Sequence, residues 1–138
     1  MSFREKSAWL MALLMTGAGF YYLYLVRGAS QALGETAPPL VVIAFILLLV
    51  NGAIVGQTIL AMCLRKEAAA PADERELLVQ ERASSWSGLV LAALAVVSLG
   101  HFMIWGDGNM LFHLILASLI AAQIAEYAIQ ILLFRRGV

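Results

Sequence analysis

The sequence predicts an all-α integral membrane protein, built as a four-helix bundle. Of its 138 residues, 62% are hydrophobic and only 13% are charged, and the mean hydropathy is +0.88, outside the usual range of soluble domains. The hydrophobic residues form four runs, each long enough to cross a hydrocarbon core of about 30 Å. Backbone amides find no water inside lipid, so each run is expected to be one continuous helix. Residues 1–138 are therefore expected to form a single transmembrane domain.

The four predicted spans cover residues 8–26, 39–64, 88–105 and 110–134. The first is longer than the apolar part of a cleaved signal peptide, which is typically about 7 to 15 residues, so we expect it to be retained. Pro39 suits the first turn of the second helix. Only GDGN separates the third and fourth spans. A turn this short requires those two helices to be adjacent and antiparallel.

The segment 65–86 is the longest polar part of the chain and is predicted to be a cytoplasmic loop. Asp73 followed three residues later by Glu76 is an N-terminal capping pattern. It predicts a short helix from about residue 73. The charges of this helix belong either to a solvated face or to a contact with a partner protein. The candidates for that contact are Asp73, Glu74, Arg75 and Glu76.

The positive charges predict the orientation in the membrane. Arg27 falls on one side of the predicted spans, and all other Lys and Arg residues fall on the side of the termini. Lys and Arg are retained in short cytoplasmic loops, so both termini are predicted to be cytoplasmic. Phe20, Tyr21, Tyr22 and Tyr24 are predicted to lie near the opposite interface.

The two halves of the sequence resemble each other weakly. REKSAW precedes the first span and QERASSW precedes the third, and each half has a shorter span followed by a longer one. Two similar helical hairpins with the same topology would be related by a pseudo-two-fold axis along the membrane normal. The alternative is chance convergence of membrane-protein composition.

Polar side chains lie within the predicted spans. Gln123, Glu126 and Gln130 fall within an arc of about 60° on the fourth helix, and Gln57 lies at similar depth on the second. An ionised carboxylate facing lipid costs several kcal/mol, so Glu126 should point into the bundle or an oligomer interface. It then serves either as a hydrogen-bonding group between helices or as a proton or cation site. A third alternative is that it extends toward the nearby interface.

The second predicted helix contains NGAIVGQT, which places small and polar residues on two faces. Gly52 and Gly56 form a GxxxG pair, which allows close packing of helices. Asn51 and Thr58 lie on roughly the opposite side. This pattern predicts protein contacts on both faces and homo-oligomerisation through one of them.

The remaining candidate groups are sparse. His101 and His113 flank the GDGN turn and could together hold heme or a metal ion. Interfacial histidines bonded to loop backbone or water are commoner, and we expect no cofactor. Cys63 is the single cysteine, so no internal disulfide can form. The sequence contains no hydrolase triad pattern, phosphate-binding glycine loop or HExxH motif, so no enzyme is expected. Nine basic residues balance nine acidic ones, which disfavours a nucleic-acid partner.

Three segments together resemble a known group: the opening MSFREKSAW, the DERE element, and the closing AEYAIQILLFRRG. They are similar to small bacterial inner-membrane proteins with four predicted spans and a domain of unknown function. The resemblance implies a bacterial cytoplasmic (inner) membrane location and a compact helical bundle. It implies no activity and no catalytic residue.

The sequence favours a non-catalytic membrane protein that acts through helix association. It would be an accessory or regulatory subunit or a homo-oligomer, with the lipid bilayer and another membrane protein as partners. The alternative is a small proton or cation transporter or channel in which Glu126 titrates. A heme protein using His101 and His113 is the third interpretation.

Overall fold

The computed structural model describes residues 3–33, 39–71 and 73–136. Within these ranges the chain forms five helices and no strands. They are α1 (Phe3–Leu33), α2 (Pro39–Cys63), α3 (Arg65–Ala68), α4 (Glu74–Trp105) and α5 (Gly108–Arg136). All except α3 are long and apolar enough to cross a membrane. These four helices indicate a multi-pass membrane protein, in agreement with the predicted spans.

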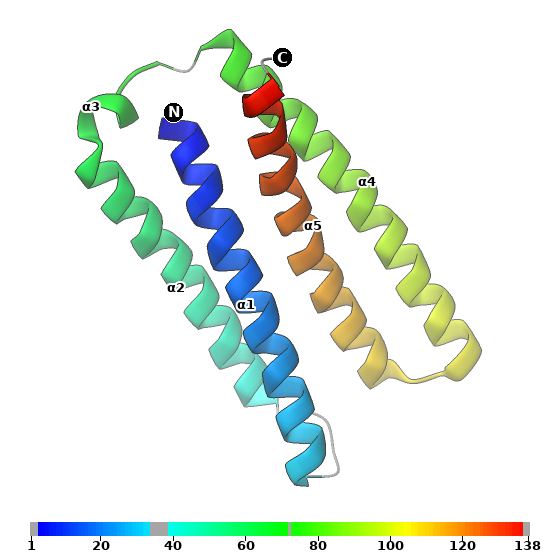
Figure 1. The fold of residues 1–138 in the computed structure, drawn as a ribbon. Coiled ribbons are helices and arrows are strands. Elements are labelled where there is room, and N and C mark those ends of the chain that lie inside the picture. The colour runs from blue at the N-terminus through cyan, green and yellow to red at the C-terminus, as the bar shows by residue number, and fades with distance from the viewer. Residues whose placement is uncertain (1–2, 34–38, 72, 137–138) are drawn as a thin grey trace.

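The four long helices are arranged in the order α2, α1, α5, α4 (Figure 1). Helix α1 packs on α2 and on α5, and α4 packs along α5. The bundle is open, because in the described part of the chain α2 and α4 do not pack along each other. The start of α1, the end of α5, α3 and the start of α4 all lie at one end of the molecule (Figure 1), which we call the terminal end.

The helix order contradicts the predicted pseudo-two-fold axis along the membrane normal. Such an axis would exchange α1 with α4 and α2 with α5, because these helices occupy equivalent places in the two halves of the sequence. It would therefore convert the extensive α1 to α5 contact into an equally extensive contact between α4 and α2. The described helices α4 and α2 make no such contact. The chain does contain two helical hairpins, but they are not arranged with this symmetry.

Helix α4 is longer than the third predicted span. It begins directly after Asp73, where a helix start was predicted, but the Asp73 side chain makes no capping hydrogen bond. It then continues without a break to Trp105. Val79, Ala83 and Ser87 repeat every fourth residue and are only 1%, 0% and 7% exposed. This buried stripe explains why the charged segment is a rigid extension of the span and not a separate short helix.

Two local features fix the connection between α4 and α5: a glycine that ends α4 and a capping aspartate at the start of α5. Gly106 ends α4 with φ 69° and its N–H donates to the carbonyl of Phe102 at 2.7 Å. Residues with a Cβ rarely adopt this left-handed conformation. The carboxylate of Asp107 accepts hydrogen bonds from the backbone N–H groups of Asn109 and Met110, both at 3.0 Å. Asp107 is therefore the N-cap of α5.

Replacing Gly106 with alanine is expected to destabilise the α4 to α5 hairpin by about 1 kcal/mol, because a Cβ strains the left-handed conformation. The measurement is thermal unfolding of the purified protein in detergent. Gly100→Ala is the matched control, since a Cβ at Gly100 also meets nothing within 4 Å but the residue lies inside α4. Equal melting temperatures for the two variants would contradict the prediction.

The buried core is small and lies between three helices. Tyr22 of α1, Phe45 of α2 and Ile120 of α5 form one cluster and are 3%, 4% and 8% exposed. Most other large apolar side chains point outward, with Phe20 at 70% and Tyr24 at 73% exposed. A soluble protein rarely exposes so much contiguous apolar surface. The outward faces of these helices suit contact with lipid.

Candidate functional site

A pocket with many polar lining residues lies at the terminal end. Its volume is about 730 Å³, within the usual range for small-molecule sites of about 300 to 1,000 Å³. Its walls come from α1, α2, α4, α5 and the α3 segment. They are Phe3, Arg4, Ser7, Gln57, Glu67, Ala68, Ala70, Pro71, Asp73, Glu76, Gln80, Glu126, Tyr127 and Gln130. The pocket therefore unites residues that are far apart in the sequence.

Three of the polar residues singled out in the predicted spans line this pocket. Gln57 comes from α2, and Glu126 and Gln130 come from α5. Gln130 is only 6% exposed. Gln123, on the same predicted arc, is half-buried and is not among the lining residues. Gln57 and Glu126, which were predicted to lie at similar depth, both line this one pocket.

Glu126 is held loosely. The Gln130 amide donates to its Oε1 at 3.4 Å. The Ser87 hydroxyl also lies 3.4 Å from the Glu126 Oε2, but the same hydroxyl lies 3.0 Å from the Ser84 carbonyl, and its one hydrogen can be donated to only one of the two. Good hydrogen bonds to carboxylates are shorter, about 2.5 to 2.9 Å. Within the described residues no Lys, Arg or His forms an ion pair with Glu126. This carboxylate therefore has one weak neutral donor, Gln130, and a second, Ser87, whose hydrogen is shared with a closer carbonyl, and it retains acceptor capacity toward the pocket.

Gln57 is bound more closely and to a different helix. The Ser7 hydroxyl of α1 lies 3.0 Å from the Gln57 Oε1 and 2.8 Å from its Nε2. This contact connects α1 and α2 and forms part of the pocket wall. Gln57 therefore acts as a hydrogen-bonding group between helices, with Ser7 as its partner. Among the described residues, no hydrogen bond joins Gln57 directly to Glu126.

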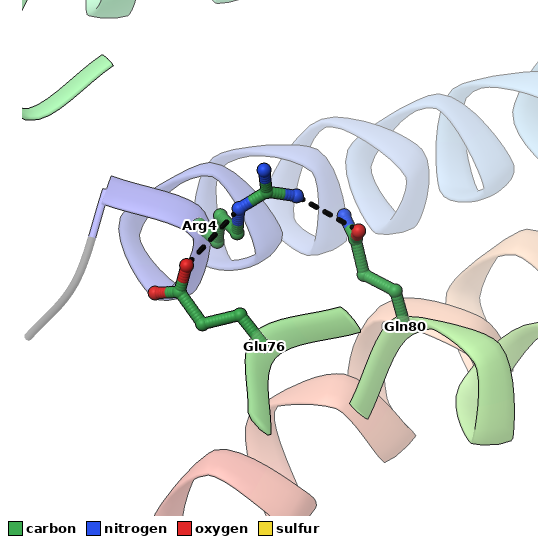
Figure 2. A network of polar contacts seen from close by, with 3 residues as sticks. All are labelled: Arg4, Glu76 and Gln80. Atoms are coloured by element: carbon green, nitrogen blue, oxygen red, sulfur yellow. Dashed lines mark hydrogen bonds and ion pairs between the residues drawn. The ribbon is translucent and has the colours of Figure 1, made fainter. Parts of the chain in front are cut away.

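An arginine near the start of α1 connects the two hairpins across the pocket (Figure 2). The Arg4 Nε lies 3.1 Å from the Glu76 carboxylate, and its Nη1 donates to the side-chain Oε1 of Gln80 at 2.9 Å. Both partners lie on the polar extension of α4. Lys6 makes a second link, with its Nζ 2.8 Å from the Glu67 carboxylate. At the terminal end, Arg4 thus joins α1 to the start of α4, and Lys6 joins α1 to α3.

The charges lining the pocket are mostly negative. Arg4 is the one cationic lining residue in the described chain, against four acidic ones: Glu67, Asp73, Glu76 and Glu126. Two of the four are neutralised, Glu76 by Arg4 and Glu67 by Lys6. Asp73 and Glu126 form no ion pair with described residues. The pocket is therefore electrostatically suited to a cationic ligand.

The four proposed partner-contact residues are placed differently from one another. Glu76 is engaged by Arg4, and Arg75 donates to the backbone carbonyl of Phe134 at 3.4 Å. Asp73 and Glu74 are exposed. In the polar extension of α4, some charged side chains thus bond to other residues of the chain. The exposed acidic side chains of Asp73 and Glu74 lie at the start of its first turn.

Several pocket residues were not singled out from the sequence. Arg4, Ser7 and Gln80 lie outside or at the edge of the predicted spans. Ser87, which contacts Glu126 but does not line the pocket, occurs in a polar segment where serine is common. Ser87 carries the one available signal, because with Val79 and Ala83 it completes a stripe with a spacing of four residues. Nothing in the sequence alone brings Arg4 to Gln80, which is 76 residues away.

The two histidines have separate partners. The His113 Nδ1 forms a hydrogen bond with the Tyr22 hydroxyl. His101 stacks on Trp105, with ring centroids 4.5 Å apart. In the part of the chain that the structure describes, no ring contact or hydrogen bond joins the two imidazoles, and no group of three or more His, Cys, Asp or Glu is placed to hold a metal. This geometry gives no support to a heme bound between them.

The two faces predicted for α2 differ in what covers them. A Cβ at Gly56 would lie 3.5 Å from Leu10 and one at Gly52 would lie 3.9 Å from Leu14, so the GxxxG pair faces α1 at ordinary contact distance. The opposite face carries Asn51, which is exposed.

Comparison with known proteins adds no assignment. No protein-family model matches the chain, and no curated protein and no solved structure is significantly similar to it. The resemblance carried by MSFREKSAW, DERE and AEYAIQILLFRRG therefore stays a prediction.

Proposed function

We propose that this chain is a small membrane transporter or channel for protons or small cations, with Glu126 as the binding carboxylate. The observation that carries the proposal is that Glu126 lines a pocket of about 730 Å³ while forming no ion pair with the described residues. Carboxylates within membrane spans are rare and commonly mark ion or proton pathways. Hydroxyl, amide and carboxylate oxygens are groups that bind hard cations. The proposed role of the pocket is therefore to bind an ion and let it pass, without a chemical reaction.

The depth of Glu126 fits this role. It lies ten positions before Arg136, the last residue of α5, which is about 15 Å along the helix. A cation entering from the terminal end thus meets Asp73 near the helix starts and Glu126 further inside. The open order of four helices encloses no central pore, so a complete pathway requires more helices than one chain supplies. Two chains would supply eight spans.

Replacing Glu126 with glutamine is expected to abolish flux, because the amide keeps the size of the side chain but removes its charge and its proton site. The measurement is proton and potassium flux in liposomes containing the purified protein. Glu81→Gln is the matched control, since Glu81 is exposed on α4 and does not line the pocket. Absence of flux from correctly folded native protein, or unchanged flux in Glu126→Gln, would contradict the proposal.

Helix association is the second proposed function, as an accessory or regulatory subunit or a homo-oligomer. The outer face of α2 favours it, because this face presents the polar side chains of Asn51 and Thr58 where the chain itself supplies no covering helix. The exposed start of the α4 extension, Asp73 and Glu74, is a further contact candidate. A partner that co-purifies with the native chain and is lost when residues 73 to 82 are altered would support a role as a subunit.

A further inference from the structure

Helix α2 lies at one edge of the bundle and has two different faces. Val42 and Phe45 face inward and are 5% and 4% exposed, and Gly56 faces Leu10 of α1. At 100° per residue, Asn51 lies on the side opposite Val42. The outward stripe consists of Ala44, Leu47, Asn51, Ile54, Val55, Thr58 and Met62, all exposed.

Asn51 is the unusual member of this stripe. It is the middle residue of α2, 12 positions from Pro39 and 12 from Cys63, or about 18 Å from either end. In a spanning helix that position is near the centre of the hydrocarbon layer. One N–H of its amide donates to the Leu47 carbonyl at 2.7 Å. The second N–H and the carbonyl oxygen form no hydrogen bond with the described residues.

Thr58, on the same stripe, differs from Asn51 because its hydrogen-bond donor is fully used within α2. Its hydroxyl donates to the Ile54 carbonyl at 2.7 Å, so its hydrogen is satisfied within α2 and lipid can face it at little cost. Asn51 cannot be satisfied in this way, because one backbone carbonyl accepts only one of its two N–H groups. An amide group without partners in hydrocarbon costs several kcal/mol. Among the described helices, α2 packs mainly on α1 and α3, and Asn51 lies on the exposed face, so a polar partner has to come from outside the chain.

We propose that this partner is Asn51 of a second copy of the chain. The two unused groups of the Asn51 amide are one donor and one acceptor, so two such amides are complementary to each other. Copies inserted in the same orientation are related by a two-fold axis along the membrane normal, which brings the same residue of each to the same depth. Ala44, Asn51 and Thr58 are spaced by seven residues, the repeat of a parallel helix pair. A single polar residue in such a seam sets its register.

This inference rests on the association proposal and names its partner and its surface. The α2 helices of two copies pack side by side along the stripe, with the apolar side chains of Leu47, Ile54 and Val55 around the central amide pair. The dimer also joins two bundles into eight adjacent spans. It leaves the α4 edge of each bundle facing lipid.

The first test is cross-linking in native-like lipid bilayers. Thr58→Cys, with Cys63→Ser to remove the native thiol, is expected to form disulfide-linked dimers on mild oxidation. Val97→Cys in the same background is the control, because Val97 is 68% exposed on α4. Cross-linking at position 97 but not at 58 would overturn the α2 assignment while leaving the association proposal intact.

The second test measures dimerisation by energy transfer between labelled copies as the protein is diluted in lipid. Asn51→Leu is expected to weaken the dimer about tenfold, the effect of one or two interhelical hydrogen bonds. Unfolding of the monomer should be unchanged, because Asn51 is exposed. A dimer equally strong in Asn51→Leu would overturn the role of the amide. A native chain that stays monomeric at every dilution would overturn the dimer, and only the additional absence of any co-purifying partner would remove the association proposal.

Discussion

Replacing Tyr22 with alanine should lower the free energy of unfolding by about 3 kcal/mol. Truncating a buried aromatic residue typically costs about 3 to 5 kcal/mol in soluble proteins. The lower figure applies because lipid is as apolar as the core, so the loss is mainly of packing contacts. Tyr22 is 3% exposed and its ring lies 5.2 Å from that of Phe45. It also bonds to His113 of α5 and so connects three helices.

The measurement is reversible unfolding of the protein in mixed micelles, followed by circular dichroism. Tyr24→Ala is the matched control, because Tyr24 lies on the same helix but is 73% exposed. Tyr22→Phe separates the two contributions, since it keeps the ring and removes only the hydrogen bond to His113. Equal effects of Tyr22→Ala and Tyr24→Ala would show that the cluster with Phe45 does not hold the hairpins together.

Replacing Gly19 with leucine is expected to destabilise the protein by about 2 kcal/mol and to separate α1 from α5. A Cβ at Gly19 would already lie 3.3 Å from the Ile120 Cγ2 and 3.9 Å from the Ile124 Cδ1. The first distance is tighter than ordinary contact, so the Ile120 side chain has to shift before a leucine at position 19 can extend into the groove of about 230 Å³ that Gly19, Ile120 and Ile124 line. Overpacking at such a site typically costs about 1 to 3 kcal/mol. The two hairpins depend on this contact for most of their association.

Gly17→Leu is a close control for this experiment. A Cβ at Gly17 meets nothing within 4 Å, and Gly17 is exposed two positions away on the same helix. Both substitutions replace a helical glycine with a good helix former, so they share any gain from helix propensity. The difference between the two variants in unfolding free energy isolates the steric effect. A difference near zero would contradict the proposed tight approach of α1 to α5.

The number of spans was predictable because hydrophobic run length is a local property. Lipid requires continuous helices, so four apolar runs predict four spanning helices without knowledge of their packing. The start of the second helix at Pro39 and the end of the third span at Trp105 could also be predicted from the local sequence. The joining of the predicted short helix to the third span was not, because it depends on burial of Val79 and Ala83 against the rest of the protein.

The polar site was predictable in part. The helical period placed Glu126 and Gln130 on one face, and similar depth suggested Gln57 as a neighbour. The helical period alone could not show that Gln123, which lies on the same face of the helix, does not line the pocket. Nor could it show that Gln57 is bonded to Ser7, because that choice depends on which helices are adjacent.

The sequence by itself determined the class of the protein, the number and approximate limits of its spans, and the polar residues within them. These follow from the chemistry of lipid, which acts on every apolar segment separately. Only the tertiary structure decided the order α2, α1, α5, α4, the link between Arg4 and Glu76, and which of four neighbouring aromatic residues, Tyr22, enters the core. All apolar faces are equally compatible with lipid, so hydrophobicity cannot select helix neighbours, and the choice depends on side-chain fit and on a few hydrogen bonds.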